Sequence, residues 1–407
     1  MTHHRIVRPA LCLLLALLAA CAPPQTEVLN PGTVSRHPAP ETVFTESSPG
    51  ALLASGDLRG ADLRDLDLTD KEDALFATGF DTNTQWPEAL PEDFDPARLL
   101  DLGKDPGLGL RKLHEQGITG KGVGIAIIDQ TLLVDHQEYR DRLRLYQEYH
   151  SAAEGGASAH GPAVASIALG ETVGAAPEAL LYFIADDLGT GEGAGFVRDM
   201  TYYAEDVDRL TDLNRTLPEG EKIRAISMSV GWMPDTPGAA ALEAAIARAR
   251  AAGIAVVCVN SRDPLLPWMG MGRRRYGSYN NRADFRPGAF WEESLYSGEY
   301  RGDENTLLVP MDRRTTASPA GENAYACFAE GGMSWAVPYA AGLYALACQV
   351  KPEVTYEEFL SAAQATARPV SIWKDGKTEY FCGKAVDPAA LLAALQSKGG
   401  RGTGRPA

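Results

Sequence analysis

Basic side chains are scarce in this chain of 407 residues, where 38 lysines and arginines stand against 54 aspartates and glutamates and leave a net charge of −16. Because an acidic surface repels phosphate backbones, we expect no nucleic-acid partner. Glycine (41) and proline (26) stay near ordinary frequencies, and 45% of the residues are hydrophobic. This balance excludes collagen, a coiled coil and a wholly disordered chain, and indicates a globular protein.

Long hydrophobic runs are missing after residue 20, so no later segment is expected to span a bilayer. At the start, Arg5 and Arg8 precede a short apolar run from Ala10 to Leu18, as in a secretory signal peptide. The run ends in Leu-Ala-Ala-Cys, which resembles the bacterial lipobox. The resemblance implies a lipidated Cys21 and a membrane-anchored lipoprotein on the extracytoplasmic side, either the periplasmic face or the cell surface. A plain signal peptide with a cysteine in its cleavage site is the alternative.

Cysteine is also rare, with six in the chain, of which Cys12 falls in the signal segment and Cys21 at the lipobox. The remaining four allow three disulfide pairings in an oxidising compartment. Two of them, Cys258 and Cys348, lie in apolar runs, which is typical of buried free thiols. Disulfides and free thiols therefore both stay open.

The chain divides by composition into five segments. A proline-rich stretch suits an extended stalk, and a glycine-rich end suits a disordered tail. We expect a signal peptide at 1–20, a stalk at 21–50, a small N-terminal region at 51–106, the main domain at 107–396 and a disordered tail at 397–407.

Within the small N-terminal region, leucines recur every five residues at Leu58, Leu63 and Leu68. This spacing resembles one coil of a pentapeptide-repeat helix, although solenoids need several stacked units to bury their faces. The alternative, which we favour, is a short strand with turns packed on the main domain.

The main domain alternates apolar strands with helices. The run 124–128 is continuously apolar, as a buried parallel strand should be, and similar runs occupy 180–184, 226–230 and 254–259. Later helices are predicted from a capping box at Thr355 and Glu358 and from Asp387 before Pro388. The alternation predicts an α/β fold with a mostly parallel sheet, in which ligands bind beyond the carboxyl ends of the strands.

Three segments place a reactive residue at the end of an element. Asp129 closes a buried strand, where a carboxylate needs a donor partner. His160 precedes a helix of small residues, and Ser334 follows two glycines at the start of an apolar helix. A helix N-terminus also stabilises negative charge that develops nearby.

The blocks GITGKGVGIAIID, HGPAVAS with GAAPEALLYF, and GGMSWAVPYAAGLYAL resemble the signature blocks of the subtilisin-like serine proteases, in that family's order of Asp, His and Ser. The resemblance covers about 107–395. It implies a three-layer α/β fold and an endopeptidase that acts on protein or peptide substrates. In it, Ser334 is the nucleophile, His160 is the base and Asp129 orients the imidazole.

The chain departs from the family pattern near each of these residues. Gln130 and Thr131 replace a small residue and glycine, Ala163 replaces a second histidine, and Met333 replaces a threonine. The departures indicate a divergent branch, and they motivate the alternative of a catalytically silent, peptide-binding lipoprotein. A further alternative is a precursor in which residues 22–106 act as an inhibitory pro-region.

The resemblance also implies an oxyanion donor and a peptide-binding edge. Asn260 follows a buried strand, as the family's asparagine does, but lacks the preceding glycine, and Asn280 and Asn281 are alternatives. The segment Ser229, Val230 and Gly231 in ISMSVGW resembles the family's edge segment, which pairs with an extended substrate backbone.

A run of three arginines, Arg273 to Arg275, is unusual in so acidic a chain. It could attract acidic substrate segments, although a solvated loop is the interpretation we favour. Histidines and cysteines show no zinc-site spacing, so we expect no catalytic metal and no cofactor. Family members often bind structural calcium, and no local run of ligands indicates such a site here.

Overall fold

The computed structural model describes residues 53–54, 56–150, 156–187, 189–190, 197–259 and 263–399. The expected signal peptide, Cys21, the expected stalk and Asn260 lie outside the described residues. Within the described part of the chain, no helix combines the length and the apolar character needed to cross a bilayer.

The central sheet has five parallel strands in the order β3-β4-β2-β7-β8. All six residues of β2 are buried, because helices cover both faces of the sheet. The strands are β2 (Gly124–Asp129), β3 (Leu143–Tyr149), β4 (Leu180–Asp186), β7 (Ile223–Met228) and β8 (Ala255–Cys258).

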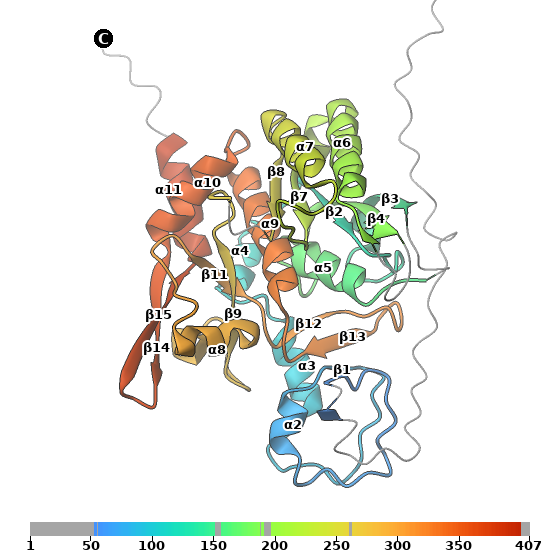
Figure 1. The fold of residues 1–407 in the computed structure, drawn as a ribbon, viewed down its shortest axis with the longest axis vertical. Helices are drawn as coiled ribbons and strands as arrows, with labels where there is room; N and C mark the ends of the chain where they lie inside the picture. Colours follow the sequence, from blue (N-terminus) through green and yellow to red (C-terminus); the bar gives the residue numbers. More distant parts are fainter. Residues whose placement is uncertain are drawn as a thin grey trace, which may run out of the picture.

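Two pairs of helices complete a three-layer α/β architecture (Figure 1). α5 (His160–Leu169) packs against α9 (Met333–Val350) on one side of the central sheet, and α6 (Thr201–Thr216) packs against α7 (Ala239–Ala251) on the other. The predicted fold class is confirmed. Because α5 and α9 both begin near the carboxyl ends of the central strands, their first residues can meet there.

A second sheet has the order β10-β9-β11-β15-β14 and lies beside α9. Its outer hairpin, β14 and β15, has no counterpart among the predicted elements. The strands are β9 (Trp268–Arg273), β10 (Phe285–Pro287), β11 (Leu307–Pro310), β14 (Arg368–Lys374) and β15 (Thr378–Ala385).

The helices around this sheet are α8 (Ala289–Ser297), α10 (Tyr356–Thr366) and α11 (Pro388–Gly399). The predicted capping box is present at α10, since Thr355 Oγ1 accepts from the amide of Glu358 and the Glu358 carboxylate accepts from the amide of Thr355. α11 extends to Gly399, so the helix runs past the boundary at 396 and the expected tail begins later than 397.

The N-terminal region joins the main domain through a three-stranded sheet, β1-β13-β12. β1 (Phe80–Asp81) pairs antiparallel with β13 (Tyr325–Phe328), which pairs with β12 (Arg314–Ala317). The region also contains α2 (Glu72–Phe76) and α3 (Pro96–Lys104), and α4 (Leu110–Glu115) follows it. Short elements elsewhere are β5 (Gly189–Thr190), β6 (Val197–Arg198) and the 3₁₀ helices Arg140–Arg142, Glu219–Glu221 and Arg282–Asp284.

The three leucines spaced by five residues, Leu58, Leu63 and Leu68, are fully buried in the core of this N-terminal region. Each donates its backbone amide to a second pass of chain between residues 79 and 89. The five-residue spacing therefore places one leucine per turn on a common inner face, and that face is covered by the region's own returning chain.

All four cysteines in the described part of the chain are free and buried: Cys258, Cys327, Cys348 and Cys382. The disulfide alternative is therefore excluded. Burial raises the pKa of each thiol, to about 12 for Cys258 and about 11 for Cys327, so these groups are poor nucleophiles at neutral pH.

Candidate active site

The first pair of predicted catalytic residues meets at the carboxyl end of the central sheet. Asp129 is the last residue of β2 and is 4% exposed, and His160 is the first residue of α5. Asp129 Oδ1 lies 2.6 Å from His160 Nδ1 and also accepts from the amide of Gln130 at 2.8 Å. The carboxylate thus holds one ring nitrogen as a donor and leaves Nε2 available to act as an acceptor.

The start of α5 is fixed by Ser158. Its Oγ accepts from the amides of His160, at 3.1 Å, and Gly161, at 3.0 Å. Gly161 also needs to be glycine, because a Cβ there would lie 2.6 Å from the carbonyl oxygen of Thr131. The backbone that carries the imidazole is therefore packed directly against the turn that follows Asp129.

The electrostatics of the pair favour a charged imidazole. Burial lowers the pKa of His160, but the charge of Asp129 and its hydrogen bond raise it, and together they bring the pKa above the ordinary 6.5. The ring is half-buried, with 29% of the side chain exposed. Asp129 therefore stabilises the imidazolium that forms when the histidine takes up a proton.

Ser334 is the second residue of α9, and Gly332 precedes the helix with a φ of 62°, a conformation that favours glycine. Ser229, which directly follows β7, donates its hydroxyl to the carbonyl oxygen of Ser334 at 3.0 Å. This contact ties the start of α9 to the end of a central strand.

Trp335 connects the start of α9 to His160. Its ring meets the His160 ring edge-on, with centroids 5.5 Å apart, and meets the ring of Phe328 at 5.1 Å. Ser334 therefore neighbours a residue in contact with the imidazole. No hydrogen bond joins the Ser334 hydroxyl to His160 within the described residues, and catalytic hydrogen bonds often tighten only when substrate is bound.

The departures from the family pattern leave this arrangement in place. Gln130 donates its backbone amide to Asp129, Ala163 is fully buried in α5, and Met333 packs against the main core. None of these side chains separates Asp129 from His160.

The expected peptide-binding segment follows β7. Val230 is buried, and its carbonyl oxygen accepts from the amide of Val259 at 2.9 Å. A Cβ at Gly231 would lie 2.5 Å from the carbonyl oxygen of Val259, so only glycine fits there. Through Ser229 the segment touches Ser334, which places it beside the candidate nucleophile.

The alternatives for the oxyanion donor are engaged elsewhere. Asn280 donates to Asp105 at 2.7 Å and accepts from the amide of Gly109 at 2.7 Å, and Asn281 donates to Asp284 at 3.1 Å. Both amide groups therefore serve local structure. Asn260 remains the expected donor and lies outside the described residues.

No group of three metal-ligating side chains occurs in the described part of the chain. Trp335 and Ser158 are the contacts that sequence reasoning missed. The only sequence signal for Trp335 is its place directly after Ser334, and Ser158 gives none beyond being a small polar residue before a helix.

Residues 120–261 match the model of the subtilase family. Over this segment the chain is similar to the subtilases. The segment contains Asp129, His160 and the expected peptide-binding edge, and it ends before Ser334. No curated protein matches the chain.

The chain is also similar to three solved proteases. The prenylagaramide maturation protease PagA shows 17% identity over 70% of this chain and 98% of that one, with a TM-score of 0.49. A cold-adapted subtilisin-like serine proteinase shows 16% identity over 66% of this chain and 89% of that one, with a TM-score of 0.44. Fervidolysin from Fervidobacterium pennivorans shows 18% identity over 70% of this chain and 45% of that one, with a TM-score of 0.49.

Proposed function

We propose that the protein is a serine endopeptidase that hydrolyses peptide bonds through Asp129, His160 and Ser334. The observation that carries the proposal is the 2.6 Å hydrogen bond between Asp129 and His160, made in a segment of subtilase sequence beside the start of α9. An ion-paired histidine alone could be structural. A serine at the start of the adjacent helix supplies the missing nucleophile.

In the proposed reaction, Ser334 Oγ attacks the substrate carbonyl carbon while His160 Nε2 takes the hydroxyl proton. The imidazolium is stabilised by Asp129 and returns the proton to the leaving amine. Negative charge develops on the carbonyl oxygen, and backbone amides at the start of α9 are suited to stabilise it. We propose Asn260 as the side-chain donor. Water then hydrolyses the acyl-enzyme.

We propose that the substrate backbone pairs with Ser229, Val230 and Gly231. Main-chain pairing gives affinity that depends little on sequence, so protein and peptide substrates of varied sequence would bind. The contact between Ser229 and Ser334 supports this placement, because it sets the edge segment next to the nucleophile. The chemistry proposed here requires no cofactor.

We propose that Cys21 is lipidated and that the enzyme is anchored on the extracytoplasmic side of a membrane. Several acyl chains on one residue would hold the protein firmly, because each buried methylene contributes about 0.8 kcal/mol. The test is metabolic labelling with a radioactive fatty acid. The label should appear in the wild type and be lost in Cys21→Ser, and equal labelling of both would contradict the anchor.

The alternative is a silent member that binds peptides without cleaving them, which the altered residues Gln130, Ala163 and Met333 motivate. A fluorophosphonate probe separates the two functions, because it reacts only with an activated serine. We expect labelling of the wild type and none of Ser334→Ala. A correctly folded wild type that takes up no label would support the silent binder.

A further inference from the structure

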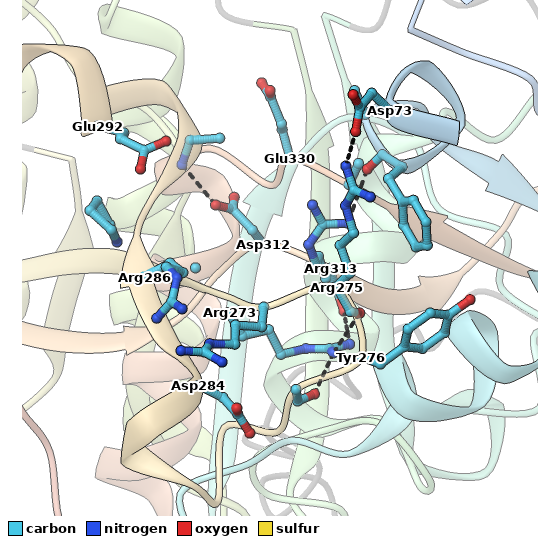
Figure 2. Close-up of a pocket in the computed structure, with 18 residues that line it drawn as sticks. Asp73, Arg273, Arg275, Tyr276, Asp284, Arg286, Glu292, Asp312, Arg313 and Glu330 are labelled. Atoms are coloured by element: carbon cyan, nitrogen blue, oxygen red, sulfur yellow. Dashed lines mark hydrogen bonds and ion pairs between the residues drawn. The ribbon is translucent and has the colours of Figure 1, made fainter. Parts of the chain in front are cut away.

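A cavity of about 870 Å³ lies where the N-terminal region meets the second sheet (Figure 2). Phe76 and Ala77 of the N-terminal region line it, as do Ala329 and Glu330 of the main domain. The arginine run expected to be a solvated loop also lines it. Arg273 is only 4% exposed, so that interpretation is wrong for this residue, although Arg274 is exposed at the rim.

Four arginines that line the cavity have no carboxylate partner among the described residues. Arg273 donates to the carbonyl oxygens of Gly277, at 2.6 Å, and Arg313, at 2.8 Å. Arg313 in turn donates to the carbonyl of Phe76 at 3.0 Å. These bonds fix the guanidinium groups through uncharged carbonyl groups and not through an ion pair.

The other two arginines, Arg274 and Arg286, also form no ion pair with a described carboxylate. Arg286 donates to the carbonyl of Phe285 at 2.5 Å, and the Arg274 side chain has no ion pair with a described residue. Arg275, by contrast, pairs with Glu72 and Asp73 of α2, and the contact with Asp73 is drawn in Figure 2.

These charges repel one another in pairs. Burial and then the charge of Arg273 lower the pKa of Arg313, and burial and then the charge of Arg274 lower the pKa of Arg286. Like charges held together destabilise the site, and a bound anion would relieve both repulsions.

Carboxylates that line the same cavity offset this repulsion only in part. Asp284 and Glu292 favour the charged form of Arg286, and Asp312 favours that of Arg313, but none of them forms an ion pair with these arginines. Asp312 is 4% exposed and accepts from the backbone amides of Gly331, at 2.9 Å, and Ala289, at 2.8 Å. Asp284 accepts from a backbone amide and from an asparagine side chain. Both carboxylates accept hydrogen bonds that hold loop residues in place, and Glu330 is exposed at the rim of the cavity.

The cavity adjoins the candidate active site along the chain. Glu330, which lines the cavity, is four residues before Ser334, so their Cα atoms are at most about 15 Å apart. An extended peptide advances about 3.3 Å per residue. We therefore expect a substrate residue two to five positions from the cleaved bond to come within reach of the cavity.

We propose that this cavity binds a carboxylate of the peptide substrate, so that the enzyme prefers peptides with an acidic group two to five residues from the cleaved bond. The inference rests on the proposed function. Paired guanidinium groups suit carboxylates, because each presents several donors in one plane. The acidic surface elsewhere would repel such peptides, so the preference depends on this site.

The test compares cleavage of peptide pairs that differ only by glutamate or glutamine at these positions, on either side of the bond. For the wild type we expect kcat/KM to be at least tenfold higher with glutamate. Arg274→Gln and the double variant Arg274→Gln/Arg286→Gln should bring the ratio toward one. Arg301→Gln, which removes an exposed arginine outside the cavity lining, should keep the wild-type ratio. The same ratio of kcat/KM for glutamate over glutamine peptides in all four proteins would overturn the proposal.

A binding measurement separates this proposal from the proposed function. Fluorescein-labelled hexaglutamate amide, hexaglutamine amide and hexaglutamine with a free carboxylate are titrated against Ser334→Ala. Binding of the hexaglutamate amide at least tenfold tighter than that of the hexaglutamine amide supports recognition of a side-chain carboxylate, and the same preference for hexaglutamine with a free carboxylate supports recognition of the terminal carboxylate. In either case, adding Arg274→Gln/Arg286→Gln to Ser334→Ala should weaken the binding, and adding Arg301→Gln should not. Equal binding of all three peptides overturns the proposal, whether or not the wild type cleaves peptides.

Discussion

Asp129 Oδ1 and His160 Nδ1 lie 2.6 Å apart, with the carboxylate at the end of a buried strand and the imidazole at the first position of a helix. The two residues are 31 positions apart in the chain and meet because β2 and α5 end and begin at the same edge of the sheet. The hydrogen bond orients the ring, and the negative charge supports its protonated form.

The first prediction concerns the pH dependence of catalysis. His160 must be neutral to accept a proton, so kcat/KM should rise with pH with a midpoint above 6.5, because Asp129 raises the pKa of this histidine. In Asp129→Asn, burial remains and the charge is gone, so the midpoint should fall below 6.5. The rate should also drop, on the order of 10⁴-fold. Profiles from pH 5 to 9 test this, and an unchanged midpoint would contradict it.

The second prediction concerns the bond from Ser229 to the carbonyl of Ser334. Removing the hydroxyl in Ser229→Ala costs a hydrogen bond worth about 0.5–1.5 kcal/mol, so kcat should fall severalfold as the start of α9 loosens. Ser297→Ala is the matched control, because it also removes a serine bond to a helical carbonyl, at the exposed end of α8. Equal effects of the two variants would show that the Ser229 contact has no special role.

The third prediction concerns the turn beneath His160. Gly161→Ala would force a methyl group to within 2.6 Å of the Thr131 carbonyl oxygen, so the start of α5 must shift. We expect a lower Tm and loss of activity. Gly220→Ala is the control, since a Cβ there meets nothing within 4 Å. The Tm and kcat of the two variants test this prediction. A fully active Gly161→Ala would contradict the close contact between Gly161 and the Thr131 carbonyl.

The fourth prediction concerns two buried carboxylates, Asp186 and Asp206, at the end of β4 and within α6. Burial raises the pKa of each, and each affects the other's pKa. The folded state therefore binds protons more tightly than the unfolded state. The stabilising contribution of this pair is therefore fully present below the ordinary pKa of about 3.9 and is lost as the pH rises through the raised values, about 7 for Asp186 and about 8 for Asp206.

Asp206→Asn should accordingly reduce the fall in Tm between pH 5 and pH 8. Asp212→Asn removes an exposed carboxylate from the same helix, where it pairs with Arg215, and should keep the wild-type dependence. Thermal unfolding at several pH values measures both. The same pH dependence of Tm in Asp206→Asn as in the wild type would contradict the raised pKa values.

The fifth prediction concerns the N-terminal region. Leu63 is fully buried in a core that includes Cys327 of the main domain, so Leu63→Ala should lower the free energy of unfolding by about 2–5 kcal/mol. Denaturant titration measures this change. A loss below 0.5 kcal/mol would show that the region is separable.

The same contacts bear on the alternative of an inhibitory pro-region. Thr315 Oγ1 donates to the carbonyl of Leu100 at 2.8 Å, and β1 adds a strand to β13. We therefore expect active enzyme to retain residues 56–106. Sequencing of its N-terminus tests this, and fully active protein that begins near Gly107 would support the precursor.

The central strands and the start of α5 could be predicted because long apolar runs and small-residue helices leave strong local patterns. The positions of Asp129 and His160 could be predicted because each residue lies at the end of one of those elements. β1 could not be predicted, since a strand of two residues has no periodicity and forms only because β13 offers an open edge. The hairpin of β14 and β15 alternates too weakly, because most of β14 is exposed or half-buried.

The arginine cavity could not be predicted either, because its walls come from residues as distant as Asp73 and Glu330. The sequence shows three adjacent arginines and cannot show that the first of them points inward. The pairing of β9 with β10 and the approach of α2 bring these walls together.

The most direct test of the central claim is the rate of casein hydrolysis by wild type and Ser334→Ala, purified identically and shown to have the same Tm. The account predicts hydrolysis by the wild type and a loss on the order of 10⁶-fold in the variant. Equal hydrolysis by the two proteins, or none by either, would contradict it.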